Sequence, residues 1–295
     1  MLFYAETPLK FAFSKEMDKG DKTFLKVQDD QKKVFGLLGV PFDSTTTYRP
    51  GARYGPLLLR ESSYNFESYN LYLDKELEAE FYDMGDMQIV PGNFKKTCKQ
   101  VQFTIKEILN LGLVPLVMGG DHSISYPVTR ALDIRKASVI HFDAHTDLRD
   151  DYAGEKYSHA TVMRRIFELK PQRIIQIGVR SSSEEEVEFA RENGVVQFTA
   201  RDVRKGIDVV VDNLASLEGP IYVTVDMDVL DPAYAPSVGT PAPGGLSPLE
   251  LETLILSLKD IDIMGLDVVE VSSSSVGDIT SINAAKVLLD FLFLH

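Results

Sequence analysis

Three potential metal ligands at alternating positions, directly after a short apolar run, constrain this chain more than any other feature. Residues 138–142 read Ser-Val-Ile-His-Phe and are followed by residues 143–147, Asp-Ala-His-Thr-Asp. In a strand, positions i, i+2 and i+4 face the same way, so Asp143, His145 and Asp147 are expected to crowd one patch. Without a cation, the two carboxylates would repel each other. The pattern therefore predicts a buried strand that ends in a metal site.

Two further apolar runs end in the same residue types. Residues 114–118 precede His122, and residues 221–225 precede Asp226 and Asp228. One such Asp alone would suggest a helix cap or a turn, but three clusters at strand ends favour metal binding. Six ligands exceed the needs of one ion, so two ions are predicted, and carboxylates without thiols favour Mn²⁺ over structural zinc. The predicted ligands are His122, Asp143, His145, Asp147, Asp226 and Asp228.

Apolar runs without polar alternation recur along the chain and predict strands that are buried on both faces. The expected strands cover residues 34–40, 80–84, 114–118, 139–142, 174–179, 195–198, 221–225 and 263–269. Helical patterns lie between them, as in residues 94–111, 160–169 and 249–258. Ser247 is the expected N-cap of the last helix, and Pro248 its first residue. Alternating strands and helices predict one α/β domain with a parallel sheet, whose ligand crevice lies at the carboxyl ends of the strands.

Composition limits the compartment in which the protein is expected and the classes of partner that it can bind. A formal net charge of −13 would repel nucleic acid and anionic membranes and attract a cationic small substrate. The single cysteine, Cys98, provides no disulfide framework, which fits a reducing compartment. Residues 1–13 lack the apolar core of a signal peptide, and no run reaches membrane-spanning length. We therefore expect a cytoplasmic protein that binds neither nucleic acid nor membrane.

The ligand segments together resemble those of the ureohydrolases, the superfamily of arginase and agmatinase. Residues 39–56, which begin Gly-Val-Pro-Phe-Asp-Ser, resemble its amino-terminal signature, and residues 265–271, Gly-Leu-Asp-Val-Val-Glu-Val, its carboxy-terminal one. Residues 34–295 are thus the expected ureohydrolase domain, with residues 1–33 an N-terminal extension packed on it. The resemblance implies a three-layer sandwich with a mostly parallel eight-stranded sheet, as in arginases and deacetylases. It also implies a homotrimer or homohexamer.

The resemblance divides the six ligands between two Mn²⁺ ions. Two carboxylates bridge the ions, and one histidine with one further carboxylate completes each set. The bridging pair is Asp143 and Asp226, while His122 with Asp147 and His145 with Asp228 complete the two sets. Two cations lower the pKa of bound water and so provide a nucleophile for the poorly electrophilic guanidinium carbon. Asp147 is also expected to orient that nucleophile.

His159 and Glu270 are the expected catalytic residues outside the ligand set. By the resemblance His159 is a proton shuttle, for which the pKa of imidazole is suited, and the alternative is a surface histidine in a first helical turn. Glu270 ends an apolar strand, where the planar fork of a substrate guanidinium would satisfy its carboxylate. A salt bridge to Arg180 is the alternative for Glu270. Residues 272–275 are serines where the family usually has Asn-Pro, which leaves the adjacent wall of the pocket undefined.

The implied reaction is hydrolysis of a guanidino group to urea and an amine, with agmatine converted to putrescine. In place of the Asn, Thr and Ser that receive the carboxylate of arginine in arginases, the loop after Asp147 carries Asp150 and Asp151. These acids are expected to bind an ammonium end, and Thr240 is a further substrate contact by resemblance. The alternative for the loop is that its acids face solvent and pair with Arg149 or Lys156.

Other functions stay open at this point. The substrate alternatives are aminopropylagmatine, guanidinobutyrate and arginine, and a homologue that binds metal without turnover is the non-enzyme alternative. A dinuclear phosphoesterase would carry a Gly-Asn-His signature and basic groups for phosphate, which this chain lacks. A deacetylase of the same fold uses one zinc ion and fewer acidic ligands.

Overall fold

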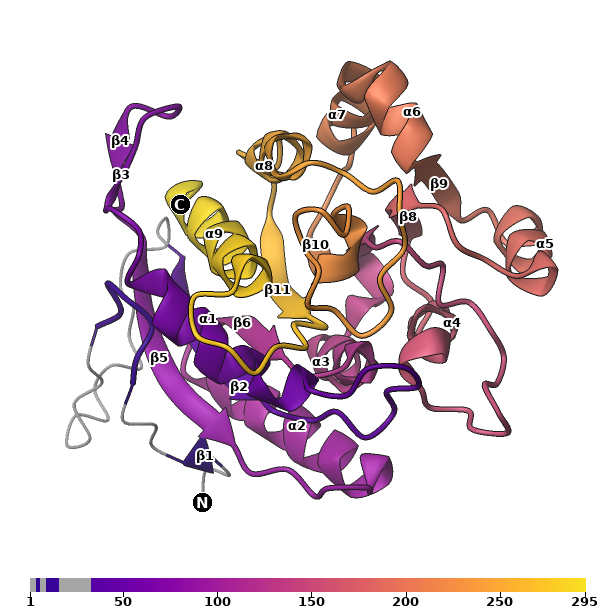
Figure 1. Cartoon of the computed structure of the whole chain (residues 1–295), viewed down its shortest axis with the longest axis horizontal. Helices are drawn as coiled ribbons and strands as arrows, with labels where there is room; N and C mark the ends of the chain where they lie inside the picture. The colour runs from indigo at the N-terminus through magenta and orange to yellow at the C-terminus, as the bar shows by residue number, and fades with distance from the viewer. Residues whose placement is uncertain (1–3, 6–8, 16–32) are drawn as a thin grey trace.

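The computed structural model describes residues 4–5, 9–15 and 33–295, and a central sheet runs through them (Figure 1). Within these residues the sheet has nine strands in the order β1-β5-β2-β6-β11-β10-β7-β8-β9. All neighbours are parallel except the antiparallel pair of β1 with β5 at one edge. The predicted mostly parallel sheet of eight strands is confirmed, and β1 adds a short ninth. The strands are β1 Tyr4–Ala5, β2 Val34–Val40, β5 Glu80–Met87, β6 Val114–Gly119, β7 Ser138–Phe142, β8 Arg173–Val179, β9 Val196–Thr199, β10 Ile221–Asp226 and β11 Ile263–Val269.

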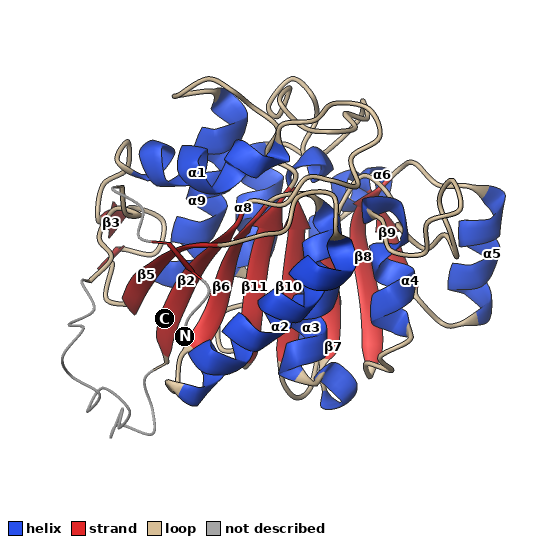
Figure 2. Ribbon diagram, turned by 90° about the horizontal axis from the view of Figure 1, so that it is seen from below, coloured by secondary structure: helices blue, strands red, loops and turns tan. Residues whose placement is uncertain are grey.

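Helices cover both faces of the sheet and confirm the three-layer sandwich. Figure 2 shows the strands between the two helix layers, with α2 and α3 in front. One layer consists of α2 Phe94–Asn110, α3 Ser125–Leu132, α4 Val162–Phe167 and α5 Glu184–Glu192. The other consists of α1 Gly55–Ser63, α6 Ala200–Lys205, α7 Ile207–Ala215, α8 Pro248–Leu256 and α9 Ile279–Phe293. Among the described helices, none combines the length and the apolar character that a membrane span requires.

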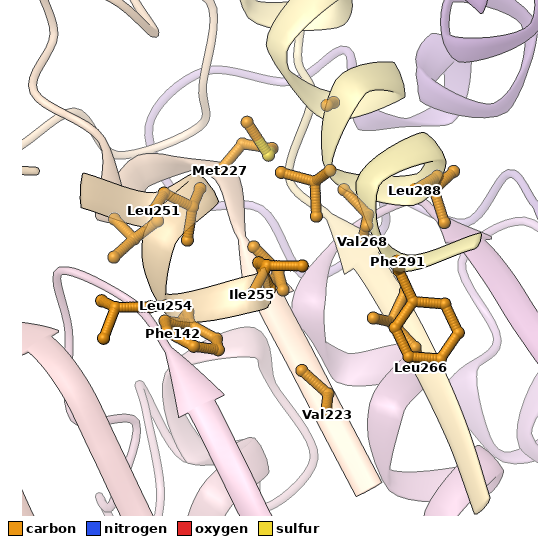
Figure 3. Packing of buried hydrophobic residues seen from close by; sticks show 14 of the residues in the cluster. Phe142, Val223, Met227, Leu251, Leu254, Ile255, Leu266, Val268, Leu288 and Phe291 are labelled. Carbon is orange, nitrogen blue, oxygen red and sulfur yellow. The ribbon is translucent and has the colours of Figure 1, made fainter. Parts of the chain in front are cut away.

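An apolar core between α8, α9 and the sheet anchors the central strands (Figure 3). Burial of each large apolar side chain contributes roughly 1.5–3 kcal/mol. The strands therefore have little freedom to shift, and the loops at their carboxyl ends start from fixed points. The core includes Phe142 of β7, Val223 of β10, Leu266 and Val268 of β11, Leu251, Leu254 and Ile255 of α8, and Leu288 and Phe291 of α9.

The structure extends β5 to Met87, beyond the predicted end at residue 84. Two acids interrupt the apolar pattern there, but both meet a cation from α1. Arg60 is fully buried, and its guanidinium contacts Asp83 at 2.8 Å and Asp86 at 2.6 Å. The paired carboxylates can stay in a buried strand because their charge is compensated.

Two further elements differ from the prediction. The helix expected over residues 160–169 is shorter, since residues 159–161 form a 3₁₀ turn before α4. A hairpin of β3 Tyr69–Asn70 and β4 Lys75–Glu76 was not predicted, because each strand has only two residues. The predicted cap of α8 is confirmed: the side chain of Ser247 accepts a hydrogen bond from the backbone of Glu250.

Most of the predicted N-terminal extension lies outside the described residues. Residues 1–3, 6–8 and 16–32 belong to that part. Of the described ones, Phe11 is buried against Phe81, and its backbone N–H donates to the carboxylate of Asp83 at 2.7 Å. The boundary after residue 33 stays a prediction.

Candidate active site

Four adjacent strands in the middle of the sheet position the candidate site. The order β6-β11-β10-β7 places residues 119, 269, 226 and 142, the last of each strand, along one edge. Because these strands are parallel, their carboxyl ends meet at that edge. Three predicted ligand segments and Glu270 follow these ends directly, so residues up to 148 positions apart become neighbours.

His122 is surrounded by carboxylates. Its Nδ1 lies 3.1 Å from Asp143 Oδ2, 3.3 Å from Asp147 Oδ2 and 3.3 Å from Asp226 Oδ2. The ring is fully buried, yet among the described residues Nδ1 has no partner in hydrogen-bond geometry. Its other nitrogen, Nε2, lies 2.9 Å from Thr224 Oγ1. A buried nitrogen without a hydrogen bond, facing three carboxylate oxygens, is the environment that a divalent cation would satisfy.

A second group of ligands forms around His145. Its Nδ1 lies 2.9 Å from Asp228 Oδ2 and 3.5 Å from Asp143 Oδ1. Asp143 thus directs one carboxylate oxygen to each histidine, which is the geometry expected of a bridging ligand. Asp226 reaches His122 through Oδ2, and its Oδ1 accepts from the backbone of Asp228 at 2.8 Å. The structure brings all six predicted ligands together.

The pKa shifts of the cluster show that it carries an excess of negative charge. Burial raises the pKa of Asp226 well above its usual range, and the carboxylates of Asp228 and Asp143 raise it further. Burial lowers the pKa of His145, but Asp228 and Asp143 overcome that effect and raise it to about 12. Both shifts mean that added positive charge stabilises the cluster. Divalent ions supply such charge, and the oxygen and imidazole donors suit Mn²⁺.

His141 supports the cluster from inside β7. Its Nε2 lies 2.7 Å from Asp143 Oδ2, and the amide of Gln176 donates to its Nδ1 at 2.9 Å. Because Nδ1 accepts, the ring proton is on Nε2 and is donated to Asp143. This arrangement holds a predicted ligand in place without using His141 as a ligand.

Two site residues adopt backbone conformations that are unusual for side chains other than glycine. Asp147 has φ 52° and Glu270 has φ 66°. Such left-handed conformations cost roughly 1–3 kcal/mol each and persist only where the surroundings hold them. The carbonyl of Asp147 accepts from the backbone of Met163 and Arg164, and the backbone of Glu270 donates to Gly120. The strain at both positions indicates that the placement of these two side chains is maintained at the expense of the stability of the fold.

Glu270 is buried beside the cluster, and no residue that the structure describes provides it with a cation. The predicted alternative, a salt bridge to Arg180, does not occur, because Arg180 donates instead to the carbonyls of Asp228 and Ala242. No ion pair within the described residues involves Glu270, and its Oε1 accepts from the backbone of His122 at 2.8 Å. Burial, with the carboxylate of Asp121, raises the pKa of Glu270 well above its usual range. A bound guanidinium would offset this cost.

A cavity of about 200 Å³ opens onto the cluster. His159 is on its wall, with Nε2 3.3 Å from Thr47 Oγ1. His159 begins a 3₁₀ turn capped by Ser158, in agreement with the alternative that it is a first-turn histidine. Burial lowers the pKa of its ring to about 4. With this pKa the ring is neutral near pH 7 but only a weak base, and a shuttle works best with a pKa near the working pH. The shuttle role of His159 stays a prediction. The wall consists of Thr47, His145, Asp147, Arg149, Tyr152, His159, Ala160, Ser181, Ser182, Glu186, Asp226 and Thr240.

The loop acids predicted to bind substrate do not line this cavity. Asp150 pairs with Arg165 at 2.6 Å, and Asp151 accepts from the backbone of Gly154 at 3.0 Å. Their role in substrate binding stays a prediction. The observed contacts are closer to the alternative, in which these acids face solvent and pair with basic side chains. Thr240 does line the cavity, 3.3 Å from the carboxylate of Asp228.

Arg149 is the cationic residue among the wall residues that the sequence analysis did not predict for the site. Its guanidinium lies 3.5 Å from Glu186 and 5.3 Å from the ring centre of Tyr152. Glu186 already accepts hydrogen bonds from the backbone of Leu148 and from Ser183, so it compensates Arg149 only in part. Little in the sequence indicates this position, because an arginine flanked by Asp147, Asp150 and Asp151 is most simply interpreted as their ion-pair partner.

Comparisons with known proteins agree with this geometry. The family model described as the arginase family matches residues 33–294. The chain is similar to an agmatinase of Pyrococcus horikoshii, with 43% identity over 256 residues, 85% of this chain and 88% of that one. An N(1)-aminopropylagmatine ureohydrolase of Thermococcus kodakarensis is 41% identical over 264 residues, covering 88% and 90%. The crystal structure of the agmatine ureohydrolase of Thermoplasma volcanium matches with a TM-score of 0.81 and 37% identity over 89% of each chain.

Proposed function

The chain belongs to the arginase family, and on this premise we propose that it is a ureohydrolase with two Mn²⁺ ions that converts agmatine to putrescine and urea. One observation carries the proposal: four neighbouring strands bring six ligands to one edge of the sheet and place Glu270 beside them. A cluster without turnover would not need a buried, uncompensated carboxylate next to its ligands.

Each side chain has a task in the proposed reaction. His122, Asp143, Asp147 and Asp226 would hold one ion, and Asp143, His145, Asp226 and Asp228 the other. When bound, two divalent ions lower the pKa of water and so supply the nucleophile. Glu270 accepts two hydrogen bonds from the guanidinium and turns its carbon toward the ions. His159 exchanges protons between the cavity and solvent, and Thr240 contacts the substrate chain.

The substrate test compares guanidines that differ only in the end remote from the reacting group. We expect urea release from agmatine or aminopropylagmatine with a kcat/KM at least tenfold above that for arginine. The support comes from the similarity to enzymes named for these two amines and from the net charge of −13, which attracts cations. The measurement is initial urea release from Mn²⁺-loaded protein. A preference for arginine would refute the substrate while leaving the ureohydrolase chemistry intact.

Arg149 favours a second candidate function, hydrolysis of a guanidino acid such as guanidinobutyrate. A guanidinium on the cavity wall would bind a carboxylate end and repel an ammonium end. If agmatine is the substrate, Arg149→Met should leave or raise its kcat/KM. If a guanidino acid is the substrate, the same change should lower kcat/KM roughly tenfold or more, since a charged hydrogen bond contributes about 1.5–3 kcal/mol. Arg149→Lys, which keeps the charge, is the matched control.

Assembly and location remain proposals. We expect a homotrimer or homohexamer in the cytoplasm. Light scattering coupled to size exclusion measures the assembly directly, and a monomer would contradict it.

A further inference from the structure

Behind His122 lies a chain of buried polar side chains that the ligand set does not explain. Its Nε2 is 2.9 Å from Thr224 Oγ1, and the hydroxyl of Thr224 donates to Asp267 Oδ1 at 2.5 Å. The phenol of Tyr222 donates to the other oxygen of Asp267. All four side chains are fully buried, and none of them lines the cavity. We call Tyr222, Thr224 and Asp267 the relay.

The direction of each hydrogen bond in the relay follows from its members. An ionised Asp267 can only accept, so the single proton of the Thr224 hydroxyl points to it. Thr224 must then accept from His122, which places the ring proton of His122 on Nε2. Its Nδ1 consequently carries the lone pair, and Nδ1 is the atom that faces Asp143, Asp147 and Asp226. The relay thus selects one tautomer out of two.

Charge gives a second reason to connect Asp267 with a bound ion. Among the ion pairs of the described residues, none involves Asp267, and its two oxygens are held by hydroxyl groups. A buried carboxylate without a cation is destabilising. A cation on Nδ1 of His122 would supply the missing charge across the imidazole ring. Asp267 is one of two acids in the segment 265–271. The other, Glu270, already has a proposed role in substrate binding, whereas Asp267 has none.

We propose that Thr224 and Asp267 are positioning residues that hold His122 in its metal-binding tautomer and strengthen its bond to the ion. The proposal rests on the metal site of the proposed function. Its test therefore measures Mn²⁺ binding itself, by titration calorimetry and by metal content after dialysis. Wild-type protein that failed to bind two ions would count against the metal site and not against the relay alone.

The first comparison uses three variants of buried threonines. Thr224→Val keeps the shape and removes the acceptor, so the affinity for one of two ions should fall roughly 10–100-fold. Thr224→Ser restores the hydroxyl and should bind within about threefold of wild type. Thr104→Val is the matched control, since Thr104 of α2 is fully buried and its hydroxyl has no hydrogen-bond partner among the described residues. It should leave both affinities unchanged.

The second comparison separates positioning from packing. Asp267→Asn can still accept from Thr224 but lacks the charge, so the affinity should fall about tenfold. The metal-free variant should unfold at the same or a higher temperature, because an uncompensated buried charge is gone. A structural role alone would lower that temperature.

Wild-type affinity in Thr224→Val, or an equal loss in Thr224→Ser, would overturn the proposal. Should Thr224→Val not fold, wild-type affinity in Asp267→Asn overturns it.

Discussion

Replacement of Glu270 by Gln is expected to reduce kcat roughly tenfold to more than a hundredfold while the protein keeps both ions. The amide has the shape of the carboxylate, and its oxygen can still accept from the backbone of His122, the contact observed at 2.8 Å. What disappears is the negative charge that would hold the guanidinium. Because this charge is buried, solvent cannot replace it. Steady-state urea release and metal analysis of the same sample make the measurement.

Gly239 provides an independent check on the position of Glu270. A Cβ at residue 239 would lie 2.7 Å from Glu270 Oε2, so Gly239→Ala should displace the carboxylate without touching the ligands. We expect a similar loss of turnover and an unchanged metal content. If Glu270→Gln kept near-normal turnover, the carboxylate would not bind the guanidinium, whatever the metal content.

Loss of one ion is expected to have the largest effect of all. Asp228→Asn removes a charged oxygen 2.9 Å from His145, and its other oxygen holds the backbone of Ala144 at 2.9 Å. We expect one ion per chain and a fall in kcat of at least a hundredfold, since both ions are needed to generate the nucleophile. A chelator should abolish the activity of the wild type, and Mn²⁺ should restore it.

The control for Asp228→Asn is Asp212→Asn, the same change at an exposed position of α7. It should retain two ions and full activity. Full turnover by metal-free protein, or by protein with a single ion per chain, would contradict the proposed mechanism. Metal content and urea release must be measured in parallel, because a fall in activity alone would not separate loss of the ion from loss of the fold.

The sequence was most informative where one local pattern had a single physical solution. Alternating acids and histidine after an apolar run fit only a strand end, so the ligand segments could be placed before their neighbours were known. The apolar runs of β2 and β11 reproduce their strands residue for residue. For β5 the pattern predicted residues 80–84 but missed the continuation to Met87, because the charge on Asp86 is compensated by Arg60, about 25 residues earlier in the chain.

Side-chain direction in the loops could not be read from composition. The acids after Asp147 suggested an ammonium pocket, but Asp150 turns to Arg165 and leaves Arg149 on the cavity wall. The partner of Asp150 comes from α4, 15 residues further along the chain, which the local pattern does not reveal. The relay behind His122 escaped notice for a related reason. Thr224 and Asp267 lie in buried strands, where an isolated polar residue gives no hint of the side chain it meets across the sheet.

The strand order also determines when during synthesis the site can exist. β6 and β7 are neighbours in sequence, yet two strands made much later, β10 and β11, lie between them. A ribosome that has released residue 150 has produced four of the six ligands, but not β10 and β11, the two strands that lie between β6 and β7. Metal incorporation must therefore wait until residue 270 has emerged. Until then β6 and β7 each lack a neighbour on the side where β11 and β10 will pair, and an unpaired strand edge favours aggregation.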